Sequence, residues 1–145
     1  MLTTVPPRRD RSRLEDYLEA IYHLSQEKGY ISTADISDRL GVKPPTVSNM
    51  VAKLAKEGYL VHERYRGMKL TDSGTKLARS VIRRHVAIFE FLSMLGVGKE
   101  IAYEDAEGIE HHLHPITVQK FERLVEFLRK NRQYLKEIEG GIDKR

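Results

Sequence analysis

Cysteine is absent from this 145-residue sequence, and so are long apolar runs, internal repeats and low-complexity tracts. Without cysteine the chain forms neither a disulfide nor a thiolate metal site, and we expect a cytoplasmic location. No segment approaches the ~18 consecutive apolar residues of a membrane span, so we expect no membrane partner. The N-terminal stretch MLTTVPPRRDRSR has arginines but no apolar core behind them, which argues against a signal peptide.

Charged residues, in contrast, are abundant and unevenly distributed. They make up 32% of the sequence beside 40% hydrophobic residues, which is the balance of a globular protein. The net charge is only +4, yet many basic residues lie in 43–84, whereas acids gather at 100–110. This asymmetry predicts one basic surface and one acidic site.

Apolar periodicity and stop signals predict three helices in the first part of the chain, over 12–28, 33–40 and 44–57. Ser32 and Asp35 have the spacing of a capping box for the second helix. The third begins with two prolines, which a helix tolerates only in its first turn.

The segment that follows changes character. YLVHERYRGMKLT has β-type residues on either side of a polar turn that contains Gly67, which predicts a small hairpin. A long helix over 72–95 and a shorter one over 100–113 come next. Two further amphipathic stretches follow Pro115. Their apolar stripe is the expected dimer contact, with packing inside a single chain as the alternative, and it comprises Phe121, Leu124, Val125 and Leu128.

Helix, short helix, turn, helix and hairpin is the element order of a winged helix-turn-helix, whose third helix enters the major groove of DNA. We therefore expect a mainly α protein in three parts. A flexible basic arm covers 1–11, and the N-terminal winged helix-turn-helix covers 12–71. An all-helical domain covers 72–145.

The side chains expected to bind DNA are short polar groups and cations on the exposed faces of the third helix and hairpin. Taken singly, each could equally be an ordinary solvated side chain. Their coincidence with the right element order favours DNA binding. The set comprises Lys43, Thr46, Ser48, Asn49, Lys53, Arg64, Arg66 and Lys69.

The acidic stretch EDAEGIEHHLH predicts a second site. At ~100° per residue, Glu107, Glu110 and His111 fall within one arc of the predicted helix, beside its apolar stripe. Asp16 and Glu19 stand three residues apart next to the apolar face of the first helix. Read separately, these acids could also be a solvated helix edge.

His85 lies in the apolar stripe of the long helix and could be an ordinary core histidine. If these groups meet, four carboxylates and two neutral imidazoles share a formal charge of −4. Like charges at that density need a partner, and two divalent cations would balance them. Oxygen and imidazole ligands without sulfur suit manganese or ferrous iron better than copper or a structural zinc.

Several motifs in order then point to one family. EDYLEAIYHL, KPPTVSNMVAKLAKEGYL, RYRGMKLTDSG, RRH and DAEGIEHHL resemble the diphtheria-toxin-repressor family of metal-dependent transcriptional regulators, most of all its manganese transport regulator branch. The resemblance covers about 12–140. It implies a homodimer that binds double-stranded operator DNA when Mn²⁺ is bound, represses manganese-uptake genes and takes no organic substrate.

The resemblance also implies a ligand set in the metal-binding and dimerisation domain and on the first helix. It implies two Mn²⁺ per subunit, with Fe²⁺, Co²⁺, Zn²⁺ or Cd²⁺ as substitutes. In the iron branch, methionine and cysteine match Asp16 and Glu107, and the carboxylates here favour manganese. The family's ligands fall on Asp16, Glu19, His85, Glu107, Glu110 and His111.

Three other functions compete with this interpretation. A di-metal carboxylate oxidase usually has two Glu-x-x-His motifs, and the sequence has none, so we expect no enzyme. A winged-helix regulator of an organic ligand would leave the acids solvated. An iron-responsive repressor of the same family is the third alternative, because the sequence leaves the choice between manganese and iron open.

Overall fold

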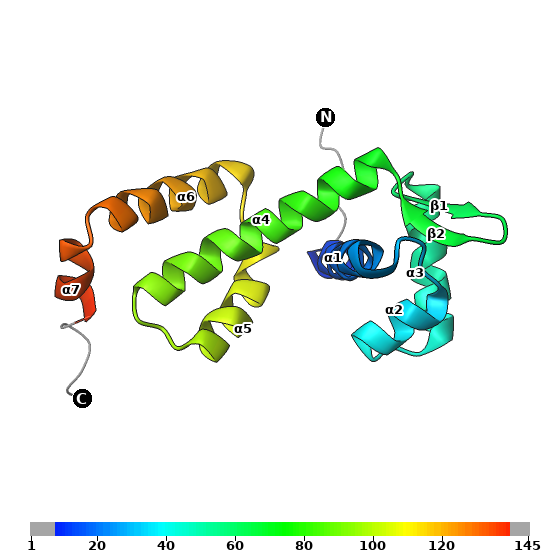
Figure 1. Ribbon diagram of the computed structural model, residues 1–145, viewed down its shortest axis with the longest axis horizontal. Coiled ribbons are helices and arrows are strands. Elements are labelled where there is room, and N and C mark those ends of the chain that lie inside the picture. The colour runs from blue at the N-terminus through cyan, green and yellow to red at the C-terminus, as the bar shows by residue number, and fades with distance from the viewer. Residues whose placement is uncertain (1–7, 140–145) are drawn as a thin grey trace. The chain divides into compact units, whose positions relative to one another are not determined.

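The computed structural model describes residues 8–139, which form seven helices and one two-stranded sheet (Figure 1). The chain divides into two compact units, and the division falls inside one helix, between Val81 and Ile82. This architecture confirms the expected fold class, a mainly α protein with a winged helix-turn-helix at its N-terminal end.

The first unit contains three helices and a hairpin. They are α1 (Arg8–Lys28), α2 (Thr33–Leu40), α3 (Pro44–Lys56), β1 (Leu60–Glu63) and β2 (Gly67–Leu70). Its core is formed by the apolar stripes predicted for the helices together with inward residues of the hairpin. The fully buried members include Leu18, Ile21, Ile36, Val47, Leu54 and Met68.

The helix-turn-helix is fixed by local signals at the ends of α2. The Ser32 hydroxyl accepts a hydrogen bond from the Asp35 backbone N–H, and the Asp35 carboxylate accepts one from the Ser32 N–H, which confirms the capping box. Gly41 ends α2 at φ 63°, in the left-handed region that glycine adopts at little cost. Pro44 then begins α3 in the position where its missing N–H costs nothing.

The hairpin is the wing of this unit and pairs Leu60 with Leu70 and Glu63 with Gly67. Its inner strand also forms an antiparallel bridge to the connection between α1 and α2, where Ile31 and Met68 exchange two backbone hydrogen bonds of 3.0 and 2.9 Å. A Cβ on Gly67 would lie 2.7 Å from the Ile31 carbonyl oxygen. The wing therefore packs directly on backbone, and only glycine fits there.

The first helix begins earlier than the sequence pattern indicated. We expected a flexible arm over 1–11, but α1 starts at Arg8, so 8–11 are helical. The reason is that no proline or glycine interrupts the chain between Pro7 and Gly29. Arg11 also forms an ion pair with the buried Glu15 one turn on, at 3.1 Å. The rest of the expected arm, 1–7, lies outside the described residues.

The second unit is helical. It contains the C-terminal part of α4 (Asp72–Met94), then α5 (Lys99–Glu110), α6 (Pro115–Lys130) and α7 (Gln133–Glu139). Two ion pairs fasten α6 to α4: a bidentate pair of Arg83 with Glu122 at 2.6 Å, and Arg129 with Glu90 at 2.7 Å. The rings of Phe91 and Phe121 also pack against each other, with centroids 5.0 Å apart.

The apolar residues of α6 do not all face one way. Val125 and Leu128, which we expected at a dimer contact, are buried in the chain itself. Leu124 is exposed, as are Phe127 and Tyr134, whose rings stack with centroids 6.1 Å apart. Among the described residues, no helix combines the length and the apolar character that crossing a membrane requires.

Candidate metal centre and nucleic-acid interface

The acidic stretch forms the C-terminal half of α5 and places two carboxylates on one helix face. Glu107 and Glu110 are three residues apart, and His111 caps the helix with its backbone. The side chain of Glu110 is completely buried, whereas that of Glu107 is one-third exposed, at 33%. His112 is exposed. Helical spacing thus places Glu107 and Glu110 on one face, and the convergence of both with His111 stays a prediction.

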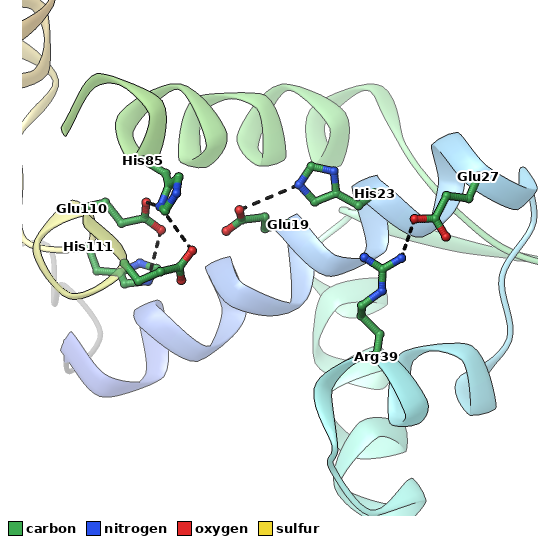
Figure 2. Close-up of polar contacts among 8 residues, drawn as sticks. Glu19, His23, Glu27, Arg39, His85, Glu110 and His111 are labelled. Carbon is green, nitrogen blue, oxygen red and sulfur yellow. Dashed lines mark hydrogen bonds and ion pairs between the residues drawn. The ribbon is translucent and has the colours of Figure 1, made fainter. Parts of the chain in front are cut away.

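His85 of α4 meets these carboxylates. Its Nδ1 lies 3.2 Å from Oε1 of Glu107 and 3.1 Å from Oε2 of Glu110. On the other side of Glu110, Nε2 of His111 lies 3.5 Å from Oε1. Figure 2 shows the two imidazoles pointing at the Glu110 carboxylate. One atom each from His85, Glu107 and Glu110 can be chosen so that all three lie within 4.8 Å of one another.

This cluster has the properties of a hard-metal site. A buried carboxylate normally accepts hydrogen bonds, but no described donor gives either Glu110 oxygen one of good geometry. An ionised carboxylate without such bonds is costly to bury unless a cation compensates it. Carboxylate oxygens with imidazole nitrogen are ligands for Mn²⁺ or Fe²⁺. The residues present thus fit a divalent cation.

Aromatic rings fix the orientation of His85. Phe89, one helical turn further along α4, lies nearly parallel to the imidazole at 6.2 Å between centroids. Tyr103 of α5 approaches edge-on, with centroids 4.8 Å apart and planes at 68°. The sequence pattern alone does not indicate a role for Tyr103. The available signal was its position four residues before Glu107, on the same face of α5.

The other two expected ligands lie on α1, in the first unit. Asp16 and Glu19 are one helical turn apart, and the Glu19 side chain is mostly buried, at 16% exposure. Its Oε1 lies 3.9 Å from Nε2 of His23, which stands one turn further along α1 (Figure 2). The joining of these acids to the His85 cluster remains a prediction.

The predicted DNA-reading residues of α3 mostly face solvent. Lys43, Thr46, Ser48 and Asn49 are exposed at the N-terminal end of the helix, opposite the buried stripe of Val47. Lys53 differs, because it is half-buried and lines a cavity of about 240 Å³ together with residues of α1 and α4. The sequence pattern did not reveal this difference, since Lys53 is also off the buried stripe.

The wing presents its cations at and behind the turn. Arg64 and Arg66 are exposed on either side of Tyr65, which is 94% exposed and has a left-handed backbone at φ 67°. Lys69 is also exposed, but its ammonium lies 2.8 Å from the Glu63 carboxylate. The pKa of Lys69 is raised mainly by its hydrogen bond to Glu63. Lys69 is thus already paired within the wing.

Comparison with known proteins assigns both units to one family. Residues 11–68 match the iron dependent repressor N-terminal DNA binding domain, and residues 71–138 match the iron dependent repressor metal binding and dimerisation domain. The chain belongs to the iron-dependent repressor family, which is the family that the sequence motifs resemble. This confirms the expectation of a DNA-binding regulator rather than an enzyme.

Relatives found by sequence and by solved structure support the same family assignment. The chain is 44% identical over 128 residues to the HTH-type transcriptional regulator MntR of Lysinibacillus sphaericus (strain C3-41), covering 88% of this chain and 92% of that protein. It is similar to the manganese regulator SloR, with a TM-score of 0.70, 33% identity, and coverage of 79% of this chain and 54% of SloR. A manganese-dependent transcriptional repressor solved in complex with manganese has a TM-score of 0.69, 31% identity, and coverage of 79% and 53%. The chain spans about half the length of these solved regulators.

Proposed function

We propose that this chain is a manganese-dependent transcriptional repressor that binds operator DNA as a homodimer when its metal site is filled, and so controls manganese uptake. The observation that supports this most is the buried Glu110 carboxylate between two imidazoles, in a chain that also has a DNA-reading half. Relatives named for manganese regulation support the choice of metal.

The proposed site holds two Mn²⁺ per subunit. His85, Glu107, Glu110 and His111 supply ligands from the metal-binding unit, and Asp16 and Glu19 supply theirs from α1. Bound metal provides the positive charge that four carboxylates need, and Fe²⁺, Co²⁺, Zn²⁺ or Cd²⁺ would compete for the same ligands with different geometric preferences. The protein's part is to hold the carboxylates together in a largely dehydrated site.

Metal binding and DNA binding are coupled in this proposal because Asp16 and Glu19 belong to the DNA-binding unit. Without metal, the carboxylates of the two units repel one another. With metal, shared ligands hold α1 to α4 and α5. The two DNA-binding domains of a dimer then take the spacing of ~34–36 Å that consecutive half-sites require. Such coupling is reciprocal, so operator DNA tightens metal binding by the same factor.

The two family domains have different proposed roles. We propose that 12–71 read DNA and that 72–145 bind metal and form the dimer, with α4 belonging to both. The exposed Leu124, Phe127 and Tyr134 on α6 and α7 are candidates for the dimer contact. Because the proposed repressor binds operator DNA, the cytoplasmic location expected from the sequence remains part of the proposal.

The decisive experiment measures binding of a fluorescent palindromic operator by anisotropy, first in chelator and then with Mn²⁺, Fe²⁺ or Zn²⁺ added. We expect weak binding in chelator and tight binding with Mn²⁺. Glu107→Ala should abolish the metal effect, whereas His112→Ala, which changes an exposed neighbour, should keep it. Equal DNA binding with and without chelator would refute the proposal, and a response to Fe²⁺ alone would make this an iron-responsive repressor.

A further inference from the structure

A polar cluster beside the turn of the wing joins it to the connection between α1 and α2. The hydroxyl of Tyr30 donates a hydrogen bond of 2.6 Å to Oε2 of Glu63, across 33 positions of sequence. The other oxygen of Glu63 lies 2.8 Å from Nζ of Lys69 on the facing strand. Both oxygens of this carboxylate are therefore engaged, one by the body of the unit and one by the wing itself.

The aromatic ring of Tyr30 contacts the cationic groups of Arg66 and Lys69. Nζ of Lys69 and Cζ of Arg66 each lie 5.9 Å from its centroid, within the range of a cation–π contact. Nη1 of Arg66 also lies 4.0 Å from the Glu63 carboxylate. The pKa of Glu63 is lowered, first by Lys69 and then by Tyr30, as expected of an ionised carboxylate held by donors.

The backbone next to Tyr30 also binds the wing. Ile31 is paired with Met68 by two hydrogen bonds, and the Ile31 carbonyl oxygen closely approaches Gly67. The strand that bears Lys69 is thus fixed to the α1–α2 connection at its backbone as well as at its side chain. Next to this cluster, Arg64 and Tyr65 are exposed at the turn.

An acid in this position is unexpected on a surface that approaches phosphates. By charge alone, Glu63 repels DNA and cancels the benefit of one neighbouring cation. Its contacts suggest a different contribution, since a cation held in place loses less conformational freedom when it binds. The wing without Glu63 would have more net positive charge but less ordered cations.

We infer that Tyr30 and Glu63 are positioning residues for the DNA-contacting wing, which hold Lys69 and Arg66 in the orientation that meets the operator backbone. The inference rests on the proposed function, because it concerns the same DNA complex. It differs from the expectation for Lys69, which the sequence suggested only as a free phosphate-binding cation.

The test compares Tyr30→Phe and Glu63→Gln in Mn²⁺-dependent operator binding across a salt series. Tyr30→Phe keeps the ring and every charge and removes only the hydroxyl that reaches Glu63. Glu63→Gln keeps the shape and removes the charge. Asp38→Asn is the matched control, because it removes one charge from an exposed acid of α2 in the same unit.

If the wing is positioned, Glu63→Gln should lower operator affinity about three- to tenfold despite the loss of a negative charge, and Tyr30→Phe should lower it about two- to threefold. The salt dependence should become shallower in both, because fewer cations meet phosphates. Asp38→Asn should leave affinity unchanged or slightly raised. Calorimetric Mn²⁺ affinity without DNA and the thermal midpoint should stay near those of the unaltered chain.

Unchanged or tighter operator binding by Glu63→Gln, with a steeper salt dependence, would overturn the inference and make Glu63 a simple repulsive charge. An unaltered affinity for Tyr30→Phe would also count against it. The proposed function fails on a different result: the unaltered chain would not respond to Mn²⁺ at all, and the inference would fall with it.

Discussion

The carboxylate of Glu110 is completely buried, and its Oε2 lies 3.1 Å from Nδ1 of His85 on another helix. A carboxylate in this environment is expensive unless a cation or a protonated group stands beside it. A divalent ion would let both side chains keep their unprotonated, ligand-competent forms. This pair is therefore the point at which metal binding can be tested most directly.

Glu110→Gln preserves the shape of the side chain but removes its charge and one ligand oxygen. We expect Mn²⁺ affinity, measured by isothermal titration calorimetry without DNA, to fall by more than the roughly 10- to 100-fold that loss of an outer hydrogen-bonding partner causes. His112→Ala, on the exposed side of the same segment, should bind Mn²⁺ normally. Equal affinity of the two variants would remove Glu110 from the ligand set.

Mn²⁺ should also raise the thermal stability of the unaltered chain. A ligand that binds only the folded state stabilises it by about 2.7 kcal/mol at a hundredfold excess over its dissociation constant. The thermal midpoint, followed by circular dichroism, should therefore rise with Mn²⁺ and return with chelator. In Glu110→Gln the same additions should produce little shift, while a full shift there would place the metal elsewhere.

Substituting two exposed residues at the start of α3 should change DNA binding in different ways. Asn49→Ala should lose discrimination between operator and altered operator by about 1–3 kcal/mol, because an amide reads base edges. Lys43→Gln should weaken binding to all sequences alike and reduce the salt slope by about 1, as expected of a phosphate contact. Competition binding with matched and mutated operators at several salt concentrations separates the two effects. The assignment fails if Asn49→Ala weakens all sequences equally.

Much of this arrangement could be predicted because its determinants are local. The capping box of Ser32 and Asp35 and the hairpin turn at Gly67 depend on residues within a few positions of one another. The helical spacing of Glu107 and Glu110 likewise predicts their common face. The burial of His85 followed from its place in an apolar stripe.

What could not be predicted depends on contacts distant in sequence. The hydrogen bond from Tyr30 to Glu63 needs the wing to fold back on the end of α1, and no local pattern reports that. Lys53 looks like Lys43 in the sequence, yet it lines a cavity because α1 and α4 pass beside it. The early start of α1 escaped notice because charged residues before Ser12 resemble a loose arm.

The capping residue Asp35 predicts a pH dependence of stability. The Lys28 ammonium, as the main cause, lowers the pKa of Asp35 from 3.8 to about 2. A depressed folded pKa means that the stabilisation is present above the unfolded value and is lost as pH falls through about 2. Asp35→Asn should therefore cost about 0.5–1 kcal/mol at neutral pH, and the deficit should vanish near pH 2.

Thermal unfolding of Asp35→Asn and the unaltered chain at a series of pH values measures this difference. Asp38→Asn, a neighbouring exposed acid on the same helix, is the control and should show a smaller deficit at neutral pH. Because the Lys28 side chain is 54% exposed, added salt should also reduce the effect of Asp35→Asn. A deficit that persists unchanged to pH 2 would show that the carboxylate charge is not its origin.

Two glycines inside helices should respond in opposite ways to alanine. At Gly74, in the first turn of α4, a Cβ would lie 2.1 Å from the backbone carbonyl oxygen of Tyr59, which cannot move aside as a side chain can. Gly74→Ala should therefore destabilise the DNA-binding unit by about 1–3 kcal/mol, as overpacking does. A Cβ added at Gly108 in α5 would have no atom within 4 Å apart from its own helix backbone. Gly108→Ala should therefore stabilise its helix by about 0.5–1 kcal/mol. Urea unfolding of both variants tests the pair, and equal stability of Gly74→Ala and the unaltered chain would mean that the contact between α4 and Tyr59 is looser than described.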